Sequence, residues 1–388
     1  MTIIYLYRSL AAFGGVERIF IDKANYLAEH YGYHVYIITW EQGGHSIVYP
    51  LSPKVTHVDW GILFYRQYQY GLFKRMFMQW KMEKEFFKKL SNFVHTTQAD
   101  IVIGASCEFT TMAGMDLLQR KTHTILETHS MRTSIEKNNP PAGNLLMRWA
   151  FKRRDKQLHQ YIKHMSAFVT LTHNDAKDWS DITPQARIIP NMLHRYPAEI
   201  SPDKKTQKRI ITAGRLVEQK GYDLLLEAVK YIWKDYPDWH LDIFGEGEMH
   251  AFLAEKIKRY NMEQYVFLKG YTQDVISEYL SSSIYVMSSR FEGFPMSLLE
   301  ATSCGLPVVS FDCPEGPADI IGEDRGILVP PEDISGLKTA LIKLMDSLDR
   351  RNEYGENGRS FVLQNYNSEA VYKKWDMLFQ SFVNSQSK

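Results

Sequence analysis

Cysteine is scarce in this chain, and it follows no disulfide or metal-binding pattern. The 388 residues include only Cys107, Cys304 and Cys313, an odd number with no Cys-x-x-Cys spacing. A disulfide framework and a structural zinc site are therefore both disfavoured. A reducing compartment, the cytoplasm, is the expected location.

Long apolar runs are also lacking. No uninterrupted apolar stretch reaches the roughly 20 residues that a membrane-spanning helix needs, and the start, MTIIYLY, is too short and too strand-like for a signal peptide. The sequence thus predicts a soluble or peripheral protein. It also has neither zinc-finger spacing nor a Lys/Arg-rich tail, which disfavours nucleic acid as a partner.

Net charge is close to zero, but it divides unevenly along the chain. Residues 1–200 carry 24 Lys and Arg against 17 Asp and Glu, a formal charge of +7. The remainder carries 22 against 28, a formal charge of −6. A basic first half suits anionic lipid, at the inner face of the membrane, or a phosphorylated substrate, and a solvated surface is the simpler alternative.

Strands and helices alternate in two successive blocks. The strands of the first block are expected at 2–7, 34–40, 55–58, 100–106, 123–128 and 167–171, and the second block restarts at 208. Such blocks predict an α/β protein with two doubly wound, Rossmann-like domains facing each other. A polar, proline-containing stretch suggests a linker, so we expect domains at 1–195 and 196–366, with a helix at about 367–388 that can pack back on the first.

One long helix of the first block, expected at 65–90, has an apolar face and a mostly separate lysine face. The apolar face consists of Leu72, Phe73, Met76, Phe77 and Trp80. Packing against the sheet is the expected use of this face, and contact with an anionic membrane surface is the alternative. A second basic and aromatic helix is expected at 144–163.

Polar or glycine-containing segments follow the strands of the second block. Gly214, Arg215 and Lys220 come after the first strand, and two fixed cations beside a helix start suit a diphosphate. The segment GEGE (245–248), beginning with Gly245, follows the next strand, and Gly270 and Tyr271 follow the one after. In open α/β sheets ligands collect at these strand ends.

The segment SSRFEGFPMSLLEA (288–301) places Glu292 and Glu300 on either side of a Gly-Phe-Pro turn that enters a helix. The first N–H groups of a helix have no internal partner and attract anions. Two carboxylates and this turn can therefore act on one bound molecule. A surface loop with solvated glutamates is the alternative.

Two further candidates lie in the first block. Gly14 and Gly15 form a strand-to-helix turn whose backbone can approach a phosphate, unless it is a simple tight turn. His129 follows a strand directly, on the edge of the sheet where chemistry occurs, unless it is an exposed loop residue.

These segments, taken together with GRLVEQKG (214–221) and SFDCPEGPADII (310–321), resemble the retaining GT-B glycosyltransferases of family four. The resemblance extends over nearly the whole chain. It implies transfer of a hexose or N-acetylhexosamine from a UDP-sugar to a glycan or lipid-linked saccharide during cell-surface polysaccharide assembly. In that family the anomeric configuration is retained.

The resemblance also implies residue roles. Arg215 and Lys220 would hold the donor diphosphate, Glu292 would contact the transferred sugar, Glu300 would bind the ribose, and His129 would lie beside the donor sugar. Further donor contacts would come from Gly14, Gly15, Gly214, Gly245, Gly270, Tyr271, Gly293, Phe294, Pro295, Met296, Ser297 and Leu298.

No metal or other cofactor is expected, since no Asp-x-Asp element is present to hold a metal-diphosphate. Fixed cations and a helix N-terminus can instead stabilise the leaving group. The expected partners are a nucleotide-sugar donor, a saccharide acceptor and an anionic membrane surface. A nucleotide-sugar 2-epimerase of the same architecture and a non-catalytic nucleotide-sugar-binding protein are the alternatives.

Overall fold

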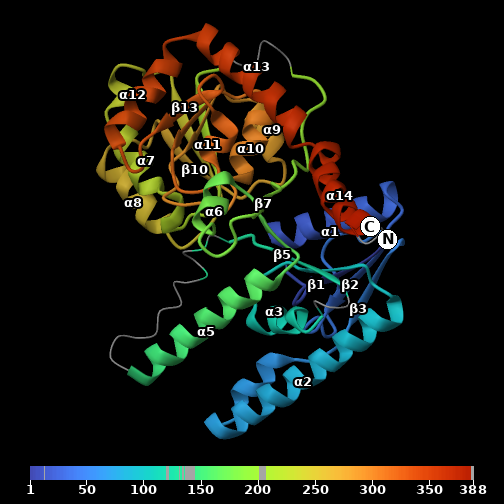
Figure 1. Ribbon diagram of the computed structural model, residues 1–388. Coiled ribbons are helices and arrows are strands. Elements are labelled where there is room, and N and C mark those ends of the chain that lie inside the picture. The colour runs from blue at the N-terminus through green and yellow to red at the C-terminus, as the bar shows by residue number, and fades with distance from the viewer. Residues whose placement is uncertain are drawn as a thin grey trace. The chain divides into compact units, whose positions relative to one another are not determined.

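The chain forms two compact units, each built on its own parallel sheet. The computed structural model describes residues 1–12, 14–118, 122–130, 132, 135, 145–200 and 207–385. Unit 1 comprises 1–171, 175–189 and 372–388, and unit 2 comprises 172–174 and 190–371. The architecture is α/β with two Rossmann-like units, as predicted (Figure 1).

Unit 1 contains a parallel sheet with strand order β3-β2-β1-β4-β5-β6-β7. The strands are β1 (Thr2–Leu6), β2 (His34–Thr39), β3 (Val55–Asp59), β4 (Ile101–Gly104), β5 (His123–Glu127), β6 (Ala167–Thr170) and β7 (Arg187–Ile188). Most of these residues are apolar or β-branched and buried, as expected where helices cover both faces of a parallel sheet. The strand order reverses between β1 and β4, which makes their carboxyl ends the point where this architecture binds ligands.

The helices of unit 1 cover the two faces of this sheet. They are α1 (Gly15–His30), η1 (Phe64–Gln69), α2 (Leu72–Thr97), α3 (Phe109–Asp116), α5 (Leu145–His164) and the greater parts of α6 (His173–Asp178) and α14 (Ser368–Ser385). On one face, Phe86, Leu90 and Val94 of α2 pack with α3 and α5 over β1, β4 and β5. Figure 1 shows α3 between α2 and α5.

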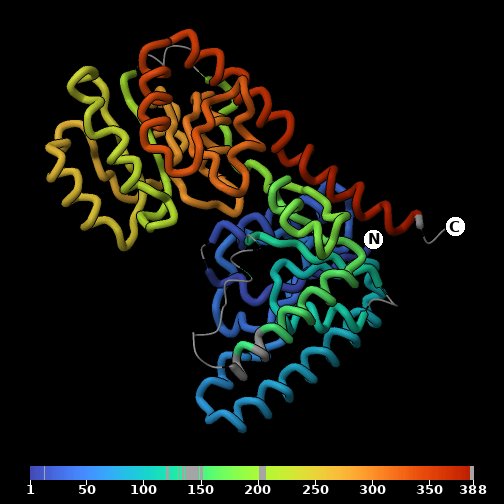
Figure 2. The backbone as a smooth tube through the Cα atoms, turned by 60° about the vertical axis from the view of Figure 1, so that its left-hand side comes forward, coloured from blue at the N-terminus to red at the C-terminus, as the bar shows by residue number. Residues whose placement is uncertain are grey.

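The prediction for the long helix of the first block was wrong in two respects. The helix is α2, which begins at Leu72 after the 3₁₀ turn η1 and continues to Thr97, where Gln98 ends it in the left-handed conformation. The apolar residues of its first half, from Leu72 to Trp80, do not pack on the sheet but are exposed. In Figures 1 and 2 the first turns of α2 extend away from the strands of unit 1, which explains why no sheet covers them.

The last helix of the chain packs on α1 within unit 1. The Tyr372 ring lies 4.5 Å from the Tyr26 ring, and the Trp375 ring lies 4.1 Å from Nζ of Lys23. Phe379 is fully buried. This helix therefore completes the hydrophobic cover of the first unit, although its sequence comes last.

Unit 2 contains a second parallel sheet, with strand order β10-β9-β8-β11-β12-β13. Its strands are β8 (Arg209–Ala213), β9 (His240–Phe244), β10 (Val266–Gly270), β11 (Ile284–Met287), β12 (Val308–Phe311) and β13 (Gly326–Val329). Its helices are η3 (Glu218–Lys220), α7 (Tyr222–Val229), η4 (Ile232–Lys234), α8 (His250–Arg259), α9 (Val275–Leu280), α10 (Met296–Ser303), α11 (Pro317–Ile321), α12 (Ile334–Met345) and α13 (Leu348–Asn365). Here the strand order reverses between β8 and β11.

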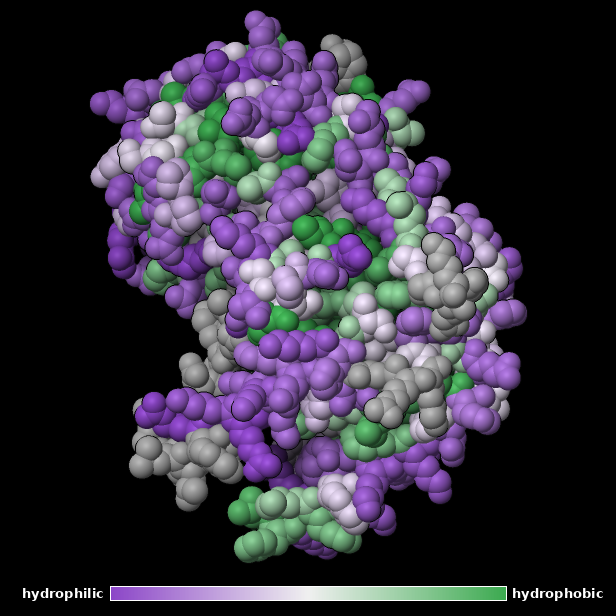
Figure 3. Space-filling model, in the orientation of Figure 1, coloured by the Kyte–Doolittle hydropathy of each residue, from purple (hydrophilic) through white to green (hydrophobic). Residues whose placement is uncertain are grey.

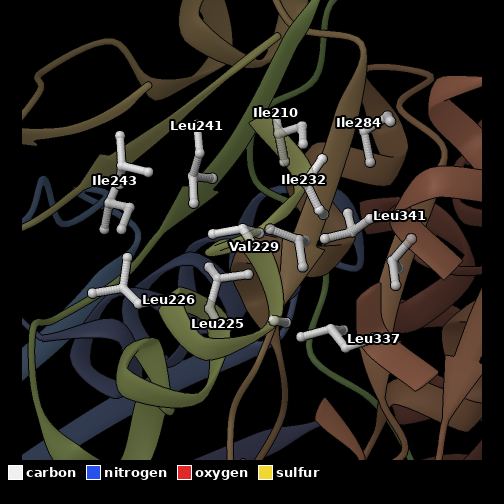
Figure 4. Packing of buried hydrophobic residues seen from close by; sticks show 14 of the residues in the cluster. Ile210, Leu225, Leu226, Val229, Ile232, Leu241, Ile243, Ile284, Leu337 and Leu341 are labelled. Atoms are coloured by element: carbon white, nitrogen blue, oxygen red, sulfur yellow. The ribbon is translucent and has the colours of Figure 1, made fainter. Parts of the chain in front are cut away.

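Successive residues of the central strands in unit 2 point to opposite faces of the sheet. Ile210 and Ile284 pack with α7, α8 and α12 on one face, whereas their neighbours Ile211 and Tyr285 pack with α9 and α10 on the other. Figure 4 shows the first of these two cores, where side chains of β8, β9 and β11 meet those of α7 and α12. The two cores fix the positions of the loops at the strand ends.

Among the described residues, no helix is both long enough and apolar enough to cross a bilayer. The three cysteines are free thiols, in agreement with the expectation from their spacing. Burial raises the pKa of each thiol, Cys107, Cys304 and Cys313, to about 12, so these side chains behave as small apolar groups.

Candidate functional site

The candidate site of unit 2 lies where the sheet order reverses. The loop after β8 and the loop after β11 meet at this point, since the two strands are neighbours and parallel. Three contacts fix the first loop on the second. The Ser288 hydroxyl donates to the Lys220 carbonyl over 3.0 Å, the Arg290 N–H donates to the Gln219 carbonyl over 2.8 Å, and Gly221 approaches Ser288.

Gly221 is required at this junction for two reasons. Its φ is +61°, which favours glycine, and a Cβ on it would lie 2.0 Å from the Ser288 carbonyl oxygen. The glycine therefore allows the backbones of the two loops to approach closely. This brings the side chain of Lys220 beside that of Glu292.

Lys220 and Glu292 form an ion pair at the centre of the site. Nζ of Lys220 lies 2.7 Å from Oε1 of Glu292, and the same oxygen accepts a 2.5 Å hydrogen bond from the Ser289 hydroxyl. Only 5% of Glu292 is exposed. Burying a carboxylate without a charged partner costs free energy of folding. Lys220 compensates the charge of Glu292, and the ion pair fixes the positions of both side chains.

A second ion pair stabilises the same loop from outside. The Arg290 guanidinium binds both carboxylate oxygens of Asp223, over 2.9 and 2.8 Å, and also donates to the Glu218 carbonyl over 2.7 Å. Partial burial alone would raise the pKa of Asp223, but the Arg290 charge outweighs it and lowers that pKa. The loop carrying Glu292 is therefore anchored on α7 as well as on the loop after β8.

A pocket of about 300 Å³ opens beside this loop at the ends of β8, β9 and β10. The two glycines at its base touch, since a Cβ on Gly245, whose φ is +133°, would lie 1.9 Å from the Gly214 carbonyl oxygen. The lining contains four of the predicted donor contacts. It is formed by Ala213, Gly214, Arg215, Phe244, Gly245, Glu246, Tyr271, Thr272 and Val275.

The Gly-Phe-Pro turn leads into α10, which begins at Met296. Pro295 precedes the helix and packs against Gly316, where a Cβ would lie 2.4 Å from its Cδ. The Ser297 hydroxyl accepts a 2.8 Å hydrogen bond from the Tyr285 hydroxyl. Glu300 lies on the same helix, half-buried and outside the lining of the 300 Å³ pocket.

The other residues predicted for unit 2 lie at a strand end or in the segment that leads from the Gly-Phe-Pro turn into α10. The Gly270 carbonyl accepts a 2.8 Å hydrogen bond from the Gly245 N–H, which ties the ends of β9 and β10 together. Gly293 and Phe294 lie in the turn before Pro295, and Leu298 is fully buried in α10. Phe294 packs against the Tyr366 ring, at 6.0 Å between centroids.

Gly14 and Gly15 lie at the start of α1 in unit 1. A Cβ on Gly14 would lie 2.0 Å from Oε2 of Glu17, whereas the space around the Cα of Gly15 is open. The Gly14 carbonyl accepts a 3.2 Å hydrogen bond from the Tyr49 hydroxyl. The backbone of Gly15 is thus exposed at the positive end of α1.

His129 lies at the end of β5 in unit 1, in a cluster of buried charges. Its side chain is 7% exposed, and its Nε2 lies 3.5 Å from Oε1 of Glu127. The other oxygen of Glu127 accepts a hydrogen bond from Lys23 of α1. Burial alone would raise the pKa of Glu127, but the Lys23 ammonium and the His129 ring hold it at about 2.

Sequence reasoning missed two parts of these sites. Ser289 lies in the segment 288–301, but neither its residue type nor its spacing indicated a hydrogen bond to Glu292. Lys23 gave a clearer signal, since it occupies a buried position on the apolar face of α1, where a lysine needs a charged partner. That partner, Glu127, is 104 residues away and becomes its neighbour only through the sheet order.

Residues 198–361 match the family model "Glycosyl transferases group 1". This matched segment, called the group 1 domain below, is less than half of the chain. This domain coincides with most of unit 2 and contains the Lys220–Glu292 pair and the 300 Å³ pocket.

Known proteins extend the likeness beyond the group 1 domain. An uncharacterised glycosyltransferase of Haemophilus influenzae is 27% identical over 96% of this chain and 98% of its own length. The amylovoran biosynthesis glycosyltransferase AmsD of Erwinia amylovora is 35% identical over 48% of this chain and 51% of its own length. The solved structure of a TarM mutant from S. aureus, in complex with fondaparinux, alpha-GlcNAc-glycerol and UDP, covers 97% of this chain and 99% of its own, with a TM-score of 0.70 at 16% identity. The fold is thus that of the GT-B glycosyltransferases.

Proposed function

We propose that this chain is a glycosyltransferase that moves a hexose or N-acetylhexosamine from a UDP-sugar to a glycan or lipid-linked saccharide in cell-surface polysaccharide assembly. The observation that carries the proposal is the buried Lys220–Glu292 pair beside the 300 Å³ pocket of a group 1 domain. Unit 2 would bind the nucleotide sugar, and unit 1 would bind the acceptor. An amylovoran biosynthesis glycosyltransferase and two enzymes that glycosylate poly(ribitol-phosphate) and poly(glycerol-phosphate) are among its relatives, and they support the choice of pathway class.

The proposed donor site uses the residues that surround this pair. Tyr271 and the glycines of the pocket would receive the base and ribose, and Arg215 and Lys220 would bind the diphosphate. Glu292 holds Lys220 in place and would accept hydrogen bonds from the sugar hydroxyls. Glu300 is assigned to the ribose on the family resemblance alone.

The proposed chemistry breaks the bond between the anomeric carbon and the diphosphate oxygen and forms a bond from that carbon to an acceptor oxygen. The acceptor proton goes to the departing phosphate, and the configuration is retained. Negative charge grows on the leaving diphosphate, where Arg215, Lys220 and the N-terminus of α10 would stabilise it. With two cations so placed, we propose that the reaction needs no metal.

The proposal assigns supporting roles to unit 1. Gly15 would meet the diphosphate through its backbone, with Gly14 shaping the turn, and His129 would contact the donor sugar. The Glu127 carboxylate lies 3.5 Å from the His129 ring and would orient it. The enzyme would work in the cytoplasm, at the inner face of the membrane, where a lipid-linked acceptor is presented.

Donor binding tests this function directly. We expect UDP and one of its sugar conjugates, among UDP-glucose, UDP-galactose and UDP-N-acetylglucosamine, to raise the melting temperature, because a ligand that binds only the folded state stabilises it. At 100 times its Kd a ligand stabilises by about 2.7 kcal/mol. Lys220→Ala should abolish this shift.

The matched control is Lys230→Ala, a lysine of unit 2 whose partner Glu227 lies on the outer side of α7. It should leave the shift unchanged. The proposal is contradicted if no uridine nucleotide stabilises the protein, or if incubation with the stabilising UDP-sugar alone yields its 2-epimer.

A further inference from the structure

The first half of α2 exposes a stripe of large apolar side chains. It consists of Leu72, Phe73, Met76, Phe77 and Trp80, which are 68%, 87%, 62%, 58% and 50% exposed in the part of the chain that the structure describes. Their spacings of one, three and four residues put them on one side of the helix. Figure 3 shows hydrophobic residues gathered over this end of α2, at the bottom of the view. Contiguous exposed patches of this kind mark interaction sites.

The stripe lies apart from the buried face of the same helix. Further along α2, Phe86, Leu90 and Val94 are buried in the core of unit 1. Phe77 and Phe86 are separated by about two and a half turns, so they lie on opposite sides of the helix. The second half of α2 therefore anchors the helix on the core, whereas the stripe faces away from that core and is the part that a partner would cover.

The charges around the stripe identify what covers it. The same turns carry Lys74, Arg75, Lys81 and Lys84 against a single acidic residue, Glu83. A symmetric contact between two copies of this chain would bring these positive charges against one another, which disfavours a dimer. An anionic lipid surface instead matches both the charge and the apolar stripe.

Aromatic and basic side chains of this region also pair in the manner of an interfacial helix. Nζ of Lys84 lies 3.9 Å from the centroid of the Trp80 ring, and the Arg75 guanidinium lies 4.1 Å from that of Tyr68. Tryptophan and tyrosine prefer the headgroup level of a bilayer, and lysine stems extend their charge toward phosphates. We infer that the first half of α2 binds anionic membrane, with Phe73 and Phe77 inserted among the acyl chains.

Other residues of α2, Gln79 and Glu83, line a pocket of about 370 Å³ in unit 1. The pocket lies at the carboxyl ends of β1, β2 and β4, where the order of that sheet reverses. Its lining combines residues of α2 and η1 with others from the strand ends: Arg8, Trp40, Glu41, Phe64, Tyr65, Gln67, Tyr68, Gln79, Glu83, Glu108, Phe109, Thr110 and Arg154. One helix thus carries both the lipid-binding stripe and part of this pocket.

The chemistry of the pocket suits a saccharide at the membrane surface. Aromatic rings offer faces for a pyranose, and carboxylates such as Glu41 and Glu108 accept hydrogen bonds from hydroxyl groups. Burial raises the pKa of the Glu108 carboxyl. The membrane contact would hold this pocket where a lipid-linked acceptor is delivered. This role of the pocket rests on the proposed function, whereas the membrane binding itself does not.

Flotation with lipid vesicles tests the inference. Vesicles of phosphatidylcholine with 30% phosphatidylglycerol should carry the protein upward in a density gradient, and vesicles of phosphatidylcholine alone or 0.5 M salt should reduce the bound fraction by about tenfold, because the attraction is partly electrostatic. The double variant Phe73→Ser/Phe77→Ser should lose binding about tenfold or more. The matched control is Phe252→Ser, which removes an aromatic ring that is 51% exposed on α8.

Three results would overturn the inference: no flotation of the unaltered protein, equal flotation of the double variant, or a dimer in solution that the double variant converts to a monomer. The last would assign the stripe to a second copy of the chain. The UDP thermal shift, measured on the same preparations, separates this inference from the proposed function. Flotation without a shift would contradict only the proposed donor site, and a shift without flotation would contradict only the membrane surface.

Discussion

Replacing Glu127 by glutamine removes the negative charge from the buried cluster of unit 1. Lys23 is 2% exposed, and its ammonium contacts the Glu127 carboxylate on one side and the Trp375 ring, at 4.1 Å, on another. Glutamine has nearly the same shape but no charge. In Glu127→Gln the lysine must therefore either keep an uncompensated buried charge or release its proton.

The expected cost is large because the two charges depend on each other. Breaking a buried ion pair by removing one partner typically costs about 3–5 kcal/mol. Burial alone would raise the pKa of Glu127, but the Lys23 ammonium and the His129 ring lower it to about 2, which agrees in sign with this loss. Because this pKa is depressed, the contribution is present above pH 4.5 and is lost as the pH falls through 2.

Urea and thermal unfolding at pH 7 provide the assay. For a unit of this size 1 kcal/mol corresponds to about 3 °C, so Glu127→Gln should lower the melting temperature by about 10 °C. The double variant Lys23→Met/Glu127→Gln removes both charges and should recover most of the loss, because apolar replacement of a whole buried pair is often neutral. A loss below 1 kcal/mol in the single variant, or no recovery in the double, would refute the reasoning.

Two other substitutions follow from the described geometry. Burial raises the pKa of Asp175 from 3.8 to about 6, so its contribution to stability is greatest below pH 3.8 and is lost as the pH rises through 6. In urea unfolding, Asp175→Asn should therefore raise the free energy of unfolding by up to about 3 kcal/mol at pH 8 and leave it unchanged at pH 3.5. An equal difference at both pH values would contradict this. Gly221→Ala should lower the free energy of unfolding by about 1–3 kcal/mol more than Gly43→Ala. Both glycines have positive φ, but only a Cβ on Gly221 would clash with the backbone, at the Ser288 carbonyl oxygen. Equal losses in the two variants would show that this close approach is relaxed in solution.

Sequence pattern was sufficient for the architecture because parallel sheets require regular alternation of strands and helices. Polar residues after the strands were expected at one edge of the sheet, and the structure does bring Lys220 and Glu292 into contact there. The strand order itself decides such contacts, and it cannot be read from a local pattern. This is why the bond from Ser289 and the link from Lys23 to Glu127 were not foreseen.

The error on α2 has a different physical cause. An apolar stripe predicts that a helix face is buried, but it does not show which surface covers that face. Phe86 and Phe77 look alike in the sequence, yet they lie about two and a half turns apart, on opposite sides of α2, and only Phe86 is buried. The distinguishing signal was a second apolar series with a spacing of four, Phe86, Leu90 and Val94, which is the one that packs on the core.

The position of α14 has a consequence for the synthesis of this protein. Residues 372–385 cover α1 in unit 1, although all of unit 2 precedes them in the sequence. Domains generally fold in order from the N-terminus as the chain leaves the ribosome. Here the first unit cannot cover Lys23 and Tyr26 of α1 until residues 372–385 have been made, so this unit starts to fold before unit 2 and is completed after it.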